Sequence, residues 1–190
     1  MISMEEIDNR YLRYISWINI KSIAFFIVLL LMILLFRKKV FSMTITLLLI
    51  LAACILPIYK RLIFVSLGFE LITFCSVVFA FAFGPLVAVI CTLIIVAASS
   101  FISWGLDTAM LPKMGVYILM TLLAALLSGF EISLAGKIIT VVMNLAFAVI
   151  YYFMYGPAQL LSGTLSIVIN IIFNFVIFTK YAEPVLGMLK

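Results

Sequence analysis

The sequence contains no histidine, and only 10% of its 190 residues are charged. Without histidine the chain cannot build a Ser-His hydrolase, a His-ligated metal site or a His-ligated haem. It also lacks the Walker-type GxxxxGK sequence that binds the phosphates of ATP. Glu70 is the only carboxylate well inside a predicted membrane span, which leaves no acid-base pair and no Asp-rich Mg²⁺ site. We therefore predict that the protein is not an enzyme and has no catalytic residue, metal site or cofactor.

What the sequence has in abundance is apolar residues, which make up 68% of the chain. A soluble domain is near half apolar and a quarter charged, and no water-soluble fold could cover this much apolar surface. Lipid offers no hydrogen bonds to the backbone, so a spanning chain must form helices or a closed barrel. The apolar runs are continuous rather than alternating, which favours helices. The sequence thus predicts an all-α, multi-pass integral membrane protein.

The charged residues point to the bilayer as the partner. The 12 basic residues exceed the 7 acidic ones, and many of the basic ones flank apolar runs, where they meet lipid headgroups. A nucleic-acid partner is therefore not expected. The three cysteines lie inside apolar segments without metal-ligand spacing, where thiols behave as small hydrophobes.

A membrane span needs about 20 mostly apolar residues, and residues 41–190 contain six segments of that kind. They are Ser42–Tyr59, Leu62–Phe83, Leu86–Trp104, Leu111–Phe130, Lys137–Tyr155 and Leu160–Thr179. We expect them to form one six-helix bundle, because charges, glycines or prolines interrupt the chain at Lys60-Arg61, Gly84-Pro85, Gly105–Asp107, Glu131–Gly136 and Gly156-Pro157.

Residues 1–40 are expected to form a polar lead-in and one extra apolar helix. Its apolar run, Ile23–Phe36, is short and either spans the bilayer or lies in the interface. If it spans, the Lys and Arg residues divide evenly between the two sides of the membrane. If it does not, most of them lie on the same side as the Arg37–Lys39 cluster. Both arrangements are compatible with a cytoplasmic Arg37–Lys39 cluster and C-terminus, the orientation that we adopt.

Polar residues inside the predicted spans are the candidate functional groups, because they are costly in lipid. Glu70 requires a polar surrounding or a basic partner, for which Lys60 and Arg61 are the candidates; the alternative is an ordinary ion pair near the interface. A second set, Ser162, Ser166, Asn170 and Asn174, lies four residues apart along the last span and so shares one inward-facing stripe. This stripe, like Asn144 on the preceding span, either lines a ligand cavity or hydrogen-bonds helices together.

Aromatic residues gather beside two of the predicted turns. Tyr151, Tyr152, Phe153 and Tyr155 precede Gly156-Pro157 and Gln159, and Trp104 precedes Gly105 and Asp107. Such clusters are typical of the aromatic belt at a membrane boundary, and the alternative is a stacking surface for a planar ligand. In the adopted orientation these turns and the Lys60 turn open on the extracytoplasmic side.

Three features carry a family resemblance: six spans of this length, the turn Ala82-Phe83-Gly84-Pro85-Leu86-Val87-Ala88 between the second and third of them, and the asparagines of the final helix. From about Ser42 onward the chain resembles the substrate-binding S-components of energy-coupling factor (ECF) vitamin transporters. The resemblance implies a six-helix bundle in the cell membrane that captures a small nutrient near its outer face. It also implies a separate transmembrane coupling protein and two cytoplasmic ATPases as partners.

The resemblance places a ligand site under the three outer turns. The residues that it implies are Glu70, Trp104, Asp107, Tyr155, Gln159, Ser162 and Ser166. Glu70 or Asp107 would supply a charged anchor, Trp104 or Tyr155 would stack on a ring, and the others would donate or accept hydrogen bonds.

Two further hypotheses remain open. The chain is also similar in size and hydropathy to the rod-shape-determining MreD family, which predicts a non-catalytic membrane scaffold within a larger complex. Small residues such as Ala97–Ser100 and Ala124-Ala125 allow the close helix approach that such docking needs, but fit internal packing equally well. An intramembrane enzyme would require a serine beside Lys113 or Lys137.

Overall fold

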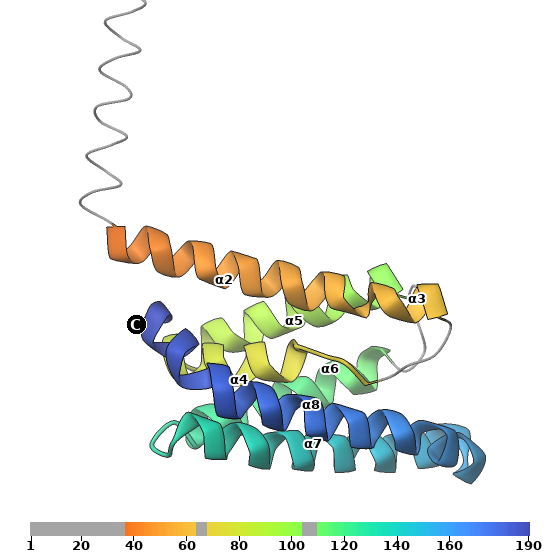
Figure 1. Ribbon diagram of the computed structural model, residues 1–190. Coiled ribbons are helices and arrows are strands. Elements are labelled where there is room, and N and C mark those ends of the chain that lie inside the picture. The colour runs from red at the N-terminus through yellow and green to blue at the C-terminus, as the bar shows by residue number, and fades with distance from the viewer. Residues whose placement is uncertain (1–36, 64–67, 104–109) are drawn as a thin grey trace, which may run out of the picture. The chain divides into compact units, whose positions relative to one another are not determined.

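The computed structural model describes residues 37–63, 68–103 and 110–190 of the chain (Figure 1). Contacts divide the chain into two compact units, Met1–Ser42 and Met43–Lys190. Most of the first unit, including the polar lead-in and the predicted apolar helix Ile23–Phe36, lies outside the described residues.

The described residues form helices, and no strand occurs among them. The elements are α2 (Arg37–Ile55), the 3-10 helix η1 (Leu56–Ile58), α3 (Tyr59–Ile63), α4 (Ile72–Phe83), α5 (Pro85–Ser103), α6 (Met110–Leu126), α7 (Ile132–Tyr155) and α8 (Pro157–Leu189). The prediction of an all-α chain is confirmed for these residues. The continuous apolar runs identified helices correctly because a strand with one solvated face would alternate.

Four of the described helices are long and apolar enough to cross a membrane: Lys38–Ile58, Pro85–Ile102, Ile132–Tyr155 and Gly163–Leu189. These helices identify a membrane protein, as predicted. The predicted count of six spans is not confirmed, because α4 has 12 residues and α6 has 17. At 1.5 Å per residue α4 is about 18 Å long, against a hydrocarbon core of about 30 Å.

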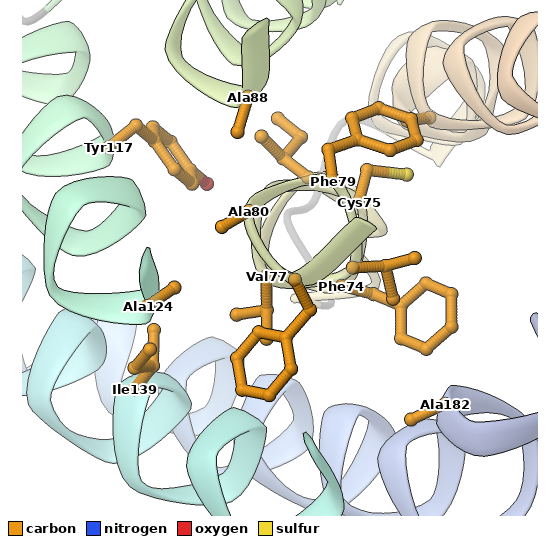
Figure 2. Packing of buried hydrophobic residues seen from close by; sticks show 14 of the residues in the cluster. Phe74, Cys75, Val77, Phe79, Ala80, Ala88, Tyr117, Ala124, Ile139 and Ala182 are labelled. Atoms are coloured by element: carbon orange, nitrogen blue, oxygen red, sulfur yellow. The ribbon is translucent and has the colours of Figure 1, made fainter. Parts of the chain in front are cut away.

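The short helix α4 lies at the centre of the bundle. Every residue from Ile72 to Phe81 is buried, and α4 contacts α5, α6, α7 and α8. In Figure 2 the labelled α4 side chains point outward in all directions, among residues such as Ala88, Tyr117 and Ala182 from the surrounding helices. A helix that is apolar on all its faces is expected where protein covers it on every side.

Three predicted boundaries are wrong. The predicted span Leu62–Phe83 is not one helix, because α3 ends at Ile63 and residues Gly68 to Leu71 are not helical. The predicted break Glu131–Gly136 is instead the first part of α7, which begins at Ile132. The last helix continues past Thr179 to Leu189.

The extension of α8 has a physical cause in one buried face. Phe178, Ala182, Leu186 and Leu189 are all buried, and their spacing places them on one side of a helix. The two charged residues of this stretch, Lys180 and Glu183, are exposed. Packing of the buried face therefore continues the helix despite these charges and Pro184.

Helices α7 and α8 lie side by side (Figure 1), and Gly136 allows their close approach. A Cβ added at Gly136 would lie 2.2 Å from the Cδ1 and Cε1 atoms of the Phe178 ring. Phe178 is itself fully buried, so the ring has no free space into which it could move. The contact explains why a glycine that looked like a helix breaker lies inside α7.

We predict that Gly136→Ala destabilises the protein by about 1–3 kcal/mol, because the added methyl group overpacks a filled core. The matched control is Gly163→Ala in α8, where a Cβ meets nothing within 4 Å in the described structure. Thermal unfolding of the detergent-solubilised variants measures both effects. Equal stability of the two variants would contradict the proposed packing.

Candidate functional site

Glu70 lies in the non-helical segment before α4 and is bonded from two directions. The Lys60 Nζ of α3 donates to Glu70 Oε1 at 3.0 Å, and the Tyr117 hydroxyl of α6 donates to Glu70 Oε2 at 2.8 Å. The side chains of Lys60 and Glu70 are 15% and 21% exposed. Lys60 is thus the basic partner, one of the two residues expected from the sequence, and each carboxylate oxygen has a partner.

The ion pair connects two parts of the chain that are ten residues apart. It therefore holds α3 against the non-helical segment before α4.

The backbone of this segment is bonded to α8. The Asn170 Nδ2 donates to the carbonyl oxygen of Gly68 at 2.8 Å, and the Asn174 Nδ2 lies 3.4 Å from the carbonyl oxygen of Glu70. Gly68 has a φ of +79°, and a Cβ at this position would lie 2.0 Å from the carbonyl oxygen of Ser166. Glycine is therefore required here both by its backbone angle and by the close contact with α8.

Phe69 connects the same segment to two helices. Its N–H donates to the Tyr59 hydroxyl at 3.2 Å. Its ring centroid lies 5.9 Å from that of Tyr59 and 5.2 Å from that of Phe173, both in edge-to-face geometry. Residues 68–70 are therefore held by backbone, charge and ring contacts together.

Asn170 and Asn174 are buried, as their helical spacing predicted, and Asn144 of α7 is buried too. The Asn144 Nδ2 donates to Asn170 Oδ1 at 3.0 Å, and the Asn174 Nδ2 donates to the same oxygen at 3.1 Å. Together with the bond from Asn170 to Gly68, these contacts join α7, α8 and the segment before α4. Among the described residues, Asn174 Oδ1 is the one buried side-chain polar atom without a hydrogen-bond partner.

A row of aromatic side chains extends from Tyr117, beside the ion pair, along α7. Ring centroids are 5.4 Å apart for Tyr117 and Phe147, 6.4 Å for Phe147 and Tyr151, and 5.9 Å for Tyr151 and Tyr155. The α7 rings are four residues apart and so share one helix face. The Lys113 Nζ lies 5.9 Å from the Tyr151 centroid, a cation–π distance. We call Tyr117, Phe147 and Tyr151 the aromatic column.

The seven predicted site residues have different outcomes. Trp104 and Asp107 lie outside the described residues. Gln159 and Ser162 belong to α8, but the structure describes only their backbone. Ser166 is half-buried beside Gly68. Tyr155 is 42% exposed, at the end of α7. The structure thus joins Glu70 and Ser166 through one segment, and their role in binding stays a prediction.

Sequence reasoning missed Gly68 and Tyr117 as parts of this site. Tyr117 occurs singly in an apolar run, and its hydroxyl was the available signal, since a buried phenol needs a hydrogen-bond partner. Gly68 gave only the general signal of a glycine in a helical pattern.

Comparisons of the chain with protein-family models, with curated proteins and with solved structures found no match.

We predict that Gly68→Ala destabilises the protein more than Gly84→Ala. Both glycines have a positive φ, +79° and +81°, so both variants carry similar backbone strain. A Cβ at Gly84 meets nothing within 4 Å in the described structure, whereas one at Gly68 collides with the α8 backbone. Thermal unfolding in detergent tests the difference, and equal losses would show that residue 68 does not pack on α8.

Proposed function

We propose that this protein is the substrate-capturing subunit of a small-molecule uptake transporter in the cell membrane. In this proposal it works with a separate transmembrane coupling protein and cytoplasmic ATPases, like the ECF S-components that its sequence resembles. The observation that carries the proposal is the interrupted chain at Gly68–Leu71, which packs on α8 and contains a charged residue.

The non-helical segment Gly68–Leu71 lies beside a candidate membrane span. Gly68 packs against Ser166 and Asn170, which belong to the candidate span Gly163–Leu189. At membrane depth such backbone is tolerated only where protein buries it or where it lines a water-filled cavity. In many membrane transporters, broken helices of this kind form the solute site.

The side chains at the interruption are those that bind solutes. Lys60 and Tyr117 supply an ammonium and a hydroxyl, each within hydrogen-bond distance of the Glu70 carboxylate. Ionisable residues in a membrane bundle are costly and therefore point to function. The 15% and 21% exposure of the pair leaves it accessible from outside the bundle.

The remainder of the chain suits a subunit that depends on others for energy. Its sequence has no nucleotide-binding motif, so ATP hydrolysis would come from the ATPase partners. The helices expose large apolar side chains such as Leu86, Leu111 and Leu126, a surface that suits lipid and a transmembrane partner.

A scaffold role, as in the MreD-like hypothesis, is favoured by one observation. Both carboxylate oxygens of Glu70 are bonded to the chain's own Lys60 and Tyr117, an arrangement that also serves simply to hold helices together. A scaffold of this kind would bind a protein partner and retain no small molecule.

Native mass spectrometry of the detergent-purified full chain separates these functions. We expect an added mass of one small molecule, lost in Glu70→Ala and kept in the control Thr179→Ala, whose exposed hydroxyl bonds the Phe175 carbonyl oxygen of its own helix. Association with a transmembrane coupling subunit would give further support. A chain that carries neither a small molecule nor such a subunit, but another membrane protein, would favour the scaffold.

A further inference from the structure

We propose that the site formed by Lys60, Glu70 and Tyr117 takes a small organic cation, whose alkylated ammonium group replaces the Lys60 ammonium against Glu70. The inference rests on the proposed function and specifies the substrate class of the same site.

Of the two side chains that bond Glu70, Lys60 is the one that can be exchanged for a ligand. Glu70 is fixed on one side by Tyr117, which is buried, and its backbone carbonyl faces Asn174. Lys60 lies on the five-residue helix α3 and reaches Glu70 through a flexible four-carbon stem. Because the pair is partly exposed, the Lys60 head group can leave toward water while Glu70 stays. Lys60 therefore occupies the position that a ligand's ammonium would take.

The aromatic column begins beside the Glu70 carboxylate. Tyr117 bonds Glu70 and meets Phe147 edge to face, with 5.4 Å between the ring centroids. Farther along the column the Tyr151 ring lies 5.9 Å from the Lys113 ammonium, so this surface already has a cation at its far end. Aromatic faces attract alkylated ammonium groups through the ring quadrupole. A carboxylate next to such faces is the recognition chemistry of an organic cation.

The pairing of Lys60 with Glu70 disfavours an anionic solute. An anion that bound Lys60 would have to displace Glu70, and the carboxylate would then remain buried without its counter-charge, which is strongly destabilising. A cation that displaces Lys60 keeps Glu70 paired. The released lysine can extend its charged head into water while its stem stays on the protein. The asymmetry between the two residues therefore favours a positively charged ligand.

The test uses three probes of nearly equal shape on the detergent-purified full chain at matched ionic strength. They are choline, its neutral isostere 3,3-dimethylbutan-1-ol and the anion 3,3-dimethylbutanoate, with binding measured by calorimetry and by the shift in unfolding temperature. We expect saturable binding of choline, with the neutral isostere about ten- to a hundredfold weaker because it lacks the charge. Binding of the isostere or of the anion as strong as that of choline, or no choline binding, overturns the inference.

Variants assign the effect to this site. Glu70→Gln should abolish choline binding, whereas Lys60→Met, which removes the internal competitor, should tighten it about fivefold. Thr179→Ala is the control and should bind like the wild type. Should Lys60→Met fail to fold, Lys60→Gln keeps a hydrogen-bond donor with no charge and serves in its place. Weaker binding in the lysine variant, or unchanged binding in Glu70→Gln, overturns the exchange of Lys60 for a ligand.

The failure of this inference differs from the failure of the proposed function. A retained small molecule that mass spectrometry identifies as neutral or anionic leaves the capture function standing and overturns the cation class. A chain that retains no small molecule, recruits no coupling subunit and ignores all three probes overturns both.

Discussion

The attachment of residues 68–71 to α8 is the constraint on which the rest of the structure depends. Backbone groups outside a helix cannot be left unbonded inside an apolar bundle. The Asn170 and Asn174 side chains of α8 bond the carbonyl groups of this segment, and Gly68 allows its backbone to lie close to that of α8. Because the chain is held in this non-helical form, α4 begins only at Ile72. Glu70 is thereby placed between α3 and α6.

Hydrogen bonds play a similar part deeper in the bundle. The Thr92 hydroxyl donates to Ser76 Oγ at 3.0 Å, and the Thr121 hydroxyl lies 3.4 Å from Thr92 Oγ1. These contacts join α4, α5 and α6 among buried apolar side chains. In a membrane, where lipid is as apolar as the protein interior, helices associate through close packing and bonds of this kind. The Gly136–Phe178 contact supplies the packing component between α7 and α8.

Part of the site could be predicted from the sequence because it is local. Lys60 and Glu70 are ten residues apart, and a buried carboxylate needs a counter-charge from nearby. The inward stripe of Asn170 and Asn174 followed from helical spacing alone. The break between α3 and α4 could not be predicted in this way, since the apolar pattern across Leu62–Phe83 is that of a continuous span. Its cause is the surface of α8, which lies about a hundred residues away in the chain.

The sequence by itself determined the class of the protein, an apolar helical membrane chain, because the transfer of apolar side chains out of water is a property of each segment taken alone. Only the tertiary structure decided which polar groups meet. Tyr117 bonds Glu70 across 47 residues of chain and Asn170 bonds Gly68 across 102. Such pairs depend on how helices pack and rotate against one another, and no local pattern of residues specifies that geometry.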